Sequence, residues 1–141
     1  MSHHQELNLL PHGPSFRFIQ EISNLDPGVS AVGTYQISGD EAFLEGHFPN
    51  NPMWPGVIMI EAIAQLGGIA AQSDPDQTRL NDMRLTSVKN TKILGFATAG
   101  ETLVIEVKVE GRLGTLIQIS GNVSVQGGEK IASGIVMLSG S

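Results

Sequence analysis

The stretch "GHFPNNPMWPGVIMIEAIAQLGG", residues 46–68, decides how the rest of the sequence is interpreted. Its first ten residues contain one histidine and three prolines, and the next thirteen are apolar or small apart from Glu61 and Gln65. Proline is favoured in a first helical turn, because its missing N–H would have had no partner there. We therefore predict a helix that begins at Pro55 and ends near Gly67 and Gly68, or one turn later.

The predicted helix is apolar on every side. Its apolar residues are Val57, Ile58, Met59, Ile60, Ala62, Ile63, Ala64 and Leu66. A helix without a polar face is usually buried in the core of a protein. Glu61 and Gln65 are the exceptions on this helix, and they are one turn apart.

The rest of the chain shows the period-two alternation of β-strands. The expected strands are Val29–Ile37, a less regular Arg84–Leu94, Leu103–Glu110, Ile117–Val125 and Ile131–Leu138, with turns at Gly111–Gly114 and at Gly127-Gly128. About five or six antiparallel strands and one long helix predict an α+β fold in which the sheet wraps around the helix. We expect a single domain over residues 1–141, with any remaining apolar surface covered by a second copy of the chain.

Composition excludes several classes of function. The net charge of −6 gives no basic face for nucleic acid, and the chain has no cysteine for thiol chemistry, disulfides or cysteine-ligated zinc. The N-terminus lacks the pattern of a leader peptide, and the apolar window Met53–Ala71 carries Glu61 and two glycines, which argues against membrane insertion. We expect a cytoplasmic protein.

Glu61 can be interpreted in two ways. A carboxylate in an apolar helix is either paired in a structural salt bridge or at an emerging surface, or it lies beside a cavity where it does chemistry. His47 favours the second interpretation, because histidine exchanges protons near neutrality and this one sits in a proline-braced loop that leads into a helix N-terminus. Together, His47 as a base, Glu61 as an acid and the exposed backbone N–H groups at the start of the helix would suit catalysis.

These residues closely resemble the signature of the β-hydroxyacyl-acyl carrier protein dehydratases of bacterial fatty-acid synthesis. The usual form is G-H-F-P-x-x-P-x-x-P-G-V-x-x-x-E-A-x-A-Q, and residues 46–65 meet every fixed position. A weaker resemblance extends over nearly the whole chain, including "LPHGPSFRFI" at 10–19 and "AGETLVIEV" at 99–107.

The resemblance implies the hot-dog fold and removal of water from a 3-hydroxyacyl thioester to give a trans-2-enoyl thioester. His47 would be the base, and Glu61, kept protonated by its apolar setting, would donate to the departing hydroxyl. The backbone N–H of Gly56 would hold the thioester carbonyl, and Gln65 would orient Glu61 or the released water. His47 of one chain would face Glu61 of its partner in a homodimer, with a trimer of dimers as the larger alternative.

The resemblance also implies the partner and the cofactors. The partner would be an acyl carrier protein with a phosphopantetheine-linked acyl chain, and no metal or organic cofactor would be needed. His3, His4 and His12 could suggest a metal cluster, but no ligand spacing recurs among them.

Two segments depart from the family pattern. "PHGPSF" has Gly13 and Pro14 where the family usually has arginine and tyrosine, at the tunnel entrance, and "LGF" at 94–96 replaces a basic K-R-P. Contact with the carrier protein would then rely on Arg84, Lys89 and Lys92.

Three alternatives stay open on the sequence alone. The first is an acyl-thioester hydrolase, since hot-dog thioesterases also use a carboxylate on the central helix. The second is a dehydratase that also isomerises the double bond, although such relatives typically have Asp at the position of Glu61. The third is a non-catalytic acyl-binding subunit.

Overall fold

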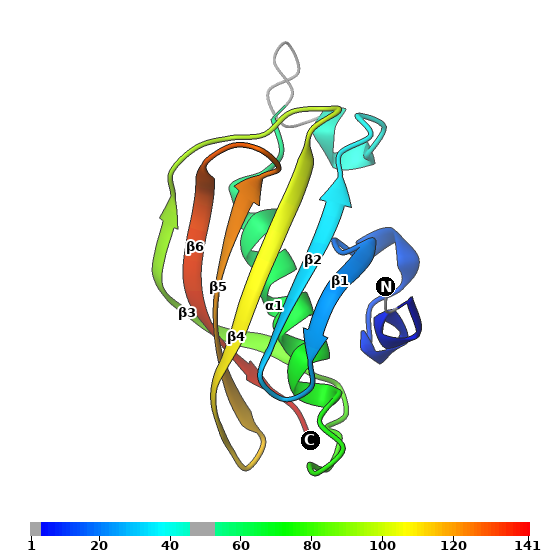
Figure 1. Cartoon of the computed structure of the whole chain (residues 1–141), viewed down its shortest axis with the longest axis vertical. Helices are drawn as coiled ribbons and strands as arrows, with labels where there is room; N and C mark the ends of the chain where they lie inside the picture. The colour runs from blue at the N-terminus through cyan, green and yellow to red at the C-terminus, as the bar shows by residue number, and fades with distance from the viewer. Residues whose placement is uncertain (1–3, 46–52) are drawn as a thin grey trace.

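The computed structural model describes residues 4–45 and 53–141. In these ranges a single α-helix, α1 (Gly56–Gln72), lies against one face of a six-stranded antiparallel sheet that curves around it (Figure 1). The strands are β1 (Glu21–Asp26), β2 (Ser30–Gln36), β3 (Arg84–Ile93), β4 (Thr102–Leu113), β5 (Leu116–Val125) and β6 (Lys130–Ser139). Their spatial order is β1-β2-β4-β5-β6-β3. The predicted α+β hot-dog architecture is confirmed.

The helix follows the prediction closely. Pro55 is the extended residue that precedes the first helical turn, rather than its first member, and the helix continues one turn beyond the glycines to Gln72. A difference of one residue at a helix end is within the usual uncertainty of such boundaries. No helix in the described ranges has the length and apolarity needed to cross a membrane.

Two strand predictions need correction. β1 was not predicted, because Ile22 is its one fully buried residue and the strand therefore lacks clear alternation. β4 runs on through Gly111, so the turn to β5 falls at Gly114 and Thr115 rather than over residues 111–114. The hairpin at Gly127 is confirmed, and its positive φ of 76° is the conformation that favours glycine in a tight turn.

The face of α1 turned toward the sheet is packed without space to spare. Ile63 and Leu66 are completely buried there. A Cβ atom added to Gly67 would lie 2.5 Å from the Ile119 side chain, and one added to Gly121 would lie 2.6 Å from the Ile63 side chain. The two glycines, one on the helix and one on β5, therefore set the close approach of helix and sheet.

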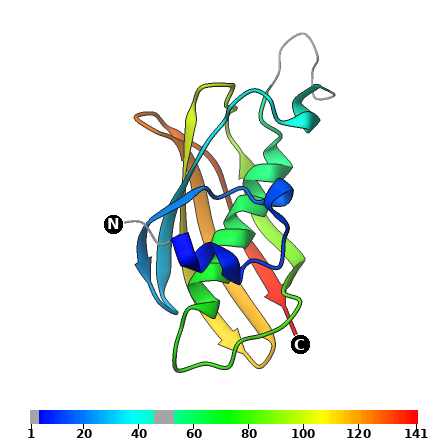
Figure 2. The same cartoon turned by 90° about the vertical axis from the view of Figure 1, so that its right-hand side faces the viewer.

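The N-terminal segment forms a third layer on the other face of α1. Figure 2 shows this segment crossing the helix on the side away from the sheet. It contains two short 3-10 turns, η1 (His4–Leu9) and η2 (Pro14–Phe16), before it enters β1. The helix is thus enclosed by the sheet on one side and by residues 4–19 on the other.

β3 is the irregular strand at one edge of the sheet. It pairs with β6 along one side, with register shifts between Leu85 and Ser87 and again between Lys89 and Lys92. All but one of its residues are exposed. The large apolar side chains among its exposed residues are Val88 and Ile93.

Candidate active site

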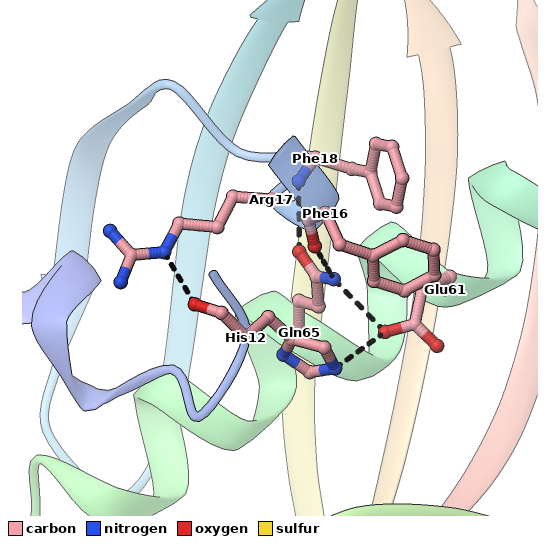
Figure 3. A network of polar contacts seen from close by, with 6 residues as sticks. All are labelled: His12, Phe16, Arg17, Phe18, Glu61 and Gln65. Atoms are coloured by element: carbon pink, nitrogen blue, oxygen red, sulfur yellow. Dashed lines mark hydrogen bonds and ion pairs between the residues drawn. The ribbon is translucent and has the colours of Figure 1, made fainter. Parts of the chain in front are cut away.

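Glu61 lies on the face of α1 that is turned toward the N-terminal segment (Figure 3). Its side chain is 19% exposed, and Gln65, one helical turn further on, donates a hydrogen bond from Nε2 to Glu61 Oε2 at 3.0 Å. Glu61 is therefore neither fully solvated nor packed into the apolar core. The contact that the predicted orienting role of Gln65 requires is present.

The amide of Gln65 is fixed by the backbone of the N-terminal segment. Its Oε1 accepts a hydrogen bond from the N–H of Phe18 at 2.9 Å, and its Nε2 donates to the carbonyl oxygen of Phe16 at 2.8 Å. Gln65 is only 2% exposed, so these buried bonds decide which end of the amide faces Glu61. Both hydrogens of the Gln65 amide are thus bonded to protein oxygens, one of which is Glu61 Oε2.

His12 is the second neighbour of Glu61. Its Nε2 lies 3.5 Å from Glu61 Oε2, its ring stacks on Phe16 with centroids 5.6 Å apart, and its carbonyl oxygen accepts a bond from Arg17 Nε. The sequence analysis considered His12 as one of three histidines and as part of "PHGPSF", but it did not predict this contact. No spacing signal could have found it, because 49 residues separate it from Glu61 and the fold alone brings them together.

Glu61 and His12 open into a cavity of about 270 Å³ between α1, the N-terminal segment and the start of β3. Its apolar walls include Leu9, Ala64, Met83 and Leu138. A cavity that is mostly apolar, with a few convergent polar groups at one place, is typical of small-molecule sites. This space could accept an apolar chain beside the carboxylate.

The predicted base, His47, lies outside the described residues. The segments on both sides of it meet in an aromatic cluster, which consists of Phe18, Tyr35, Phe43 and Trp54. The ring centroids of Phe43 and Trp54 are 4.9 Å apart, and those of Tyr35 and Trp54 are 5.0 Å apart. Trp54 also donates its backbone N–H to the carbonyl oxygen of Ala97, which holds the segment that begins at Met53.

The carboxylate of Glu41 anchors the segment that leads up to residue 45. Glu41, just before η3 (Ala42–Glu45), accepts hydrogen bonds from the Tyr35 hydroxyl and from the backbone N–H groups of Ser38 and Gly39. Burial alone would raise the pKa of Glu41, but the donors together lower it below its ordinary value of 4.5. Burial, followed by the bond to Glu41, raises the pKa of Tyr35, so this pair stays neutral tyrosine and ionised carboxylate at neutral pH.

Gly56, the predicted carbonyl-binding residue, lies at a different cavity, of about 370 Å³. The other lining residues are Met53, Trp54, Ile93, Leu94, Gly95 and Phe96. The first N–H groups of a helix have no partner within it, which makes this end a donor site. A Cβ atom on Gly56 would come within 3.1 Å of Ile93. Within one chain, then, Gly56 and Glu61 line different cavities.

The predicted basic contact residues Arg84, Lys89 and Lys92 are all on β3 and all exposed. Arg84 also borders the Glu61 cavity. A line of positive side chains along one edge could attract an acidic partner.

Solved structures share this architecture. The chain matches a structure from the dehydratase heterocomplex ApeI:P of Xenorhabdus doucetiae with a TM-score of 0.80 and 17% identity, over 96% of this chain and 90% of that one. It matches a hypothetical thioesterase from Streptococcus pneumoniae, solved with coenzyme A, with a TM-score of 0.65 and 13% identity, over 86% and 84% of the two chains. At these identities the likeness establishes the hot-dog fold alone.

Comparison of the sequence with known families and proteins identifies the family of this chain. The FabA-like domain family matches residues 10–134, and the chain belongs to that family. It is 35% identical to the 3-hydroxyacyl-[acyl-carrier-protein] dehydratase FabZ of Clostridium acetobutylicum, over 92% of this chain and 91% of the relative. It is 37% identical to the FabZ of Chloroflexus aggregans, over 72% and 70% of the two chains. The resemblance recognised in residues 46–65 is confirmed.

Proposed function

We propose that this protein removes water from 3-hydroxyacyl-[acyl-carrier-protein] thioesters to give trans-2-enoyl thioesters in fatty-acid synthesis. The observation that carries the proposal is Glu61, which lines a largely apolar cavity, accepts a hydrogen bond from Gln65 and stands within an intact dehydratase signature. The FabZ relatives and the family supply the reaction class.

Each step of the reaction has a residue suited to it. His47 takes the proton from C2 while the Gly56 N–H supports the thioester oxygen, on which negative charge develops. Glu61 gives a proton to the C3 hydroxyl as the C3–O bond breaks. The products are the C2–C3 double bond and one water molecule. Return of the proton from His47 to Glu61, through solvent, restores the enzyme.

The proposed partners are a second chain and the carrier protein. We propose a homodimer in which His47 approaches the partner's carboxylate, and the separate cavities of Gly56 and Glu61 within one chain support this arrangement. The exposed β3 edge supports such an association, since Ile93 and the neighbouring Phe96 are 49% and 62% exposed. A trimer of dimers is the larger assembly to test.

The acidic carrier protein would dock near Arg84, Lys89 and Lys92. We propose a cytoplasmic location, which suits a chain without cysteine.

The test is hydration of a trans-2-enoyl thioester, followed by loss of its conjugated ultraviolet absorbance. We expect activity in the wild type and its loss in both His47→Ala and Glu61→Gln. The matched control is Glu129→Gln, the same change at an exposed turn between β5 and β6, which should keep full activity.

Other outcomes separate the alternatives. Release of free thiol without hydration would indicate a thioesterase, and an acyl chain retained unchanged would indicate a binding subunit. Activity recovered by mixing inactive His47→Ala and Glu61→Gln chains would support the shared site. No recovery in a verified mixed dimer would contradict it.

A further inference from the structure

The two oxygens of Glu61 have different surroundings. Oε2 accepts the bond from Gln65 Nε2 at 3.0 Å and lies 3.5 Å from His12 Nε2. Oε1 lies on the other side of the carboxylate, away from both of these groups (Figure 3). One oxygen is therefore held by the protein, while the other remains available to a ligand.

His12 is held so that its ring reaches this carboxylate. The ring stacks on Phe16, and the backbone carbonyl of His12 accepts a bond from Arg17 at 2.9 Å. The other ring nitrogen, Nδ1, is buried without a hydrogen-bond partner in the part of the chain that the structure describes. The polar contact that the structure records for this imidazole ring is thus the one with Glu61.

Proton donation by Glu61 leaves a negative charge on its carboxylate. N–H groups that already point at the place where a charge develops stabilise it without reorganisation. Gln65 supplies one such group to Oε2, but its other amide hydrogen is bonded to Phe16. A further donor from the described residues around Oε2 would have to come from His12, through Nε2–H.

We propose that His12 is a positioning residue for Glu61 in the dehydration reaction. Its Nε2–H supports Oε2 together with Gln65, so that Oε1 carries the proton that passes to the leaving hydroxyl. This inference rests on the proposed function, because it assigns a role only to an enzyme in which Glu61 is the acid.

The alternative is that His12 serves only as part of the cavity wall. A wall residue would affect how well the acyl chain binds and how stable the fold is, and hence KM and the melting temperature. A residue that supports the charge on Glu61 acts mainly in the transition state, and its loss lowers kcat. The two roles therefore differ in a measurable way.

The decisive comparison is between His12→Gln and His12→Asn, measured as hydration of a trans-2-enoyl thioester. The glutamine amide nitrogen can take the place of Nε2, whereas the shorter asparagine amide reaches only the place of Nδ1. We expect His12→Gln to keep kcat close to the wild-type value. His12→Asn should lose about ten-fold in kcat with little change in KM, less than the loss of a short oxyanion donor because the 3.5 Å contact is long.

Asn8→Ala, an exposed change in the same N-terminal segment, is the control and should leave both constants unchanged. Equal kcat values for the two His12 variants, or a loss confined to KM, would overturn the proposal. If the wild type itself does not hydrate the thioester, the proposed function is wrong, and the role of His12 with it. This result is distinguishable from a failure of the His12 proposal alone, in which the wild type is active.

A second measurement does not depend on the folding of the variants. In wild-type protein labelled with 15N-histidine, the ring resonances of His12 can be identified through its contact with Phe16. We expect a proton on Nε2. A proton on Nδ1 with a bare Nε2 would contradict the proposal, because Nε2 could not then donate to Glu61.

Discussion

The two faces of α1 differ in packing and in polarity. The face toward the sheet is apolar and so closely packed that Gly67 and Gly121 have no room for a Cβ atom. The face toward the N-terminal segment carries Glu61, Gln65 and Gln72, and it borders a cavity. The comparison teaches that one helix can be fixed by close packing on one side and can hold a partly buried carboxylate beside a cavity on the other. Variants on each face test this division.

The largest effect on stability is expected on the sheet face. Ile63→Ala removes a completely buried side chain that packs over Gly121, and it should lower the free energy of unfolding by about 2–5 kcal/mol. Chemical denaturation measures this. Val57→Ala, at a position on the same helix that is 75% exposed, is the control and should change stability by less than about 0.5 kcal/mol. Similar losses from both would contradict the assignment of the packed face.

Two neighbouring glycines sharpen the comparison. Gly67→Ala places a methyl group 2.5 Å from Ile119, so overpacking should cost about 1–3 kcal/mol in spite of the better helix propensity of alanine. Gly68→Ala meets only Leu138, at 3.6 Å, and should be neutral or stabilising by up to about 1 kcal/mol. Gly67→Ala should therefore lower the melting temperature, whereas Gly68→Ala should leave it unchanged or raise it. A parallel shift would mean that the helix does not approach β5 as closely as described.

On the polar face, stability and catalysis should separate. Gln65→Leu leaves the Phe18 N–H and the Phe16 carbonyl without their partner and should cost about 1–3 kcal/mol. Gln72→Leu removes two equivalent bonds to the backbone of Leu80 and should cost about as much. Only Gln65 also contacts Glu61, so kcat for hydration should fall more in Gln65→Leu. An equal fall in kcat would show that Gln65 acts through stability alone.

The smallest expected effect is a pH-dependent contribution of Glu41 to stability. The lowered pKa of Glu41 means that the folded protein favours its ionised form, so this contribution to stability is present above about pH 4.5 and is lost as the pH falls below it. Glu41→Gln should melt at a lower temperature than the wild type near neutral pH, and the difference should shrink at about pH 3. Thermal melts across this range test it. A constant difference would show that Glu41 acts through size rather than charge.

The sequence predicted the helix and most strands because their signals are local. Pro55 and the apolar run after it mark the helix, and alternation marks β4, β5 and β6. β1 was not predicted from the sequence, because a strand with one buried residue has no clear alternation of apolar and polar residues. The packing of Gly67 against Ile119 was not predicted either, since it depends on how the helix is placed over the sheet.

The candidate site also contains residues that the sequence could select and contacts that only the fold creates. Glu61 and Gln65 could be selected from the sequence because they interrupt an apolar helix one turn apart. His12 could not be paired with Glu61, since that contact exists only after the N-terminal segment has crossed the helix. The backbone of Phe16 and Phe18 gives no sequence signal as the anchor of Gln65, because any residue type could supply those two groups.

That anchoring by main-chain atoms has a consequence for how such a protein can diverge. Gln65 is gripped by a carbonyl and an N–H, so the neighbouring side chains are not tied to the carboxylate. Gly13 and Pro14 are both exposed, and neither supplies one of these two backbone groups. Such exposed positions can therefore change in sequence while the alignment of α1 with the N-terminal segment is kept.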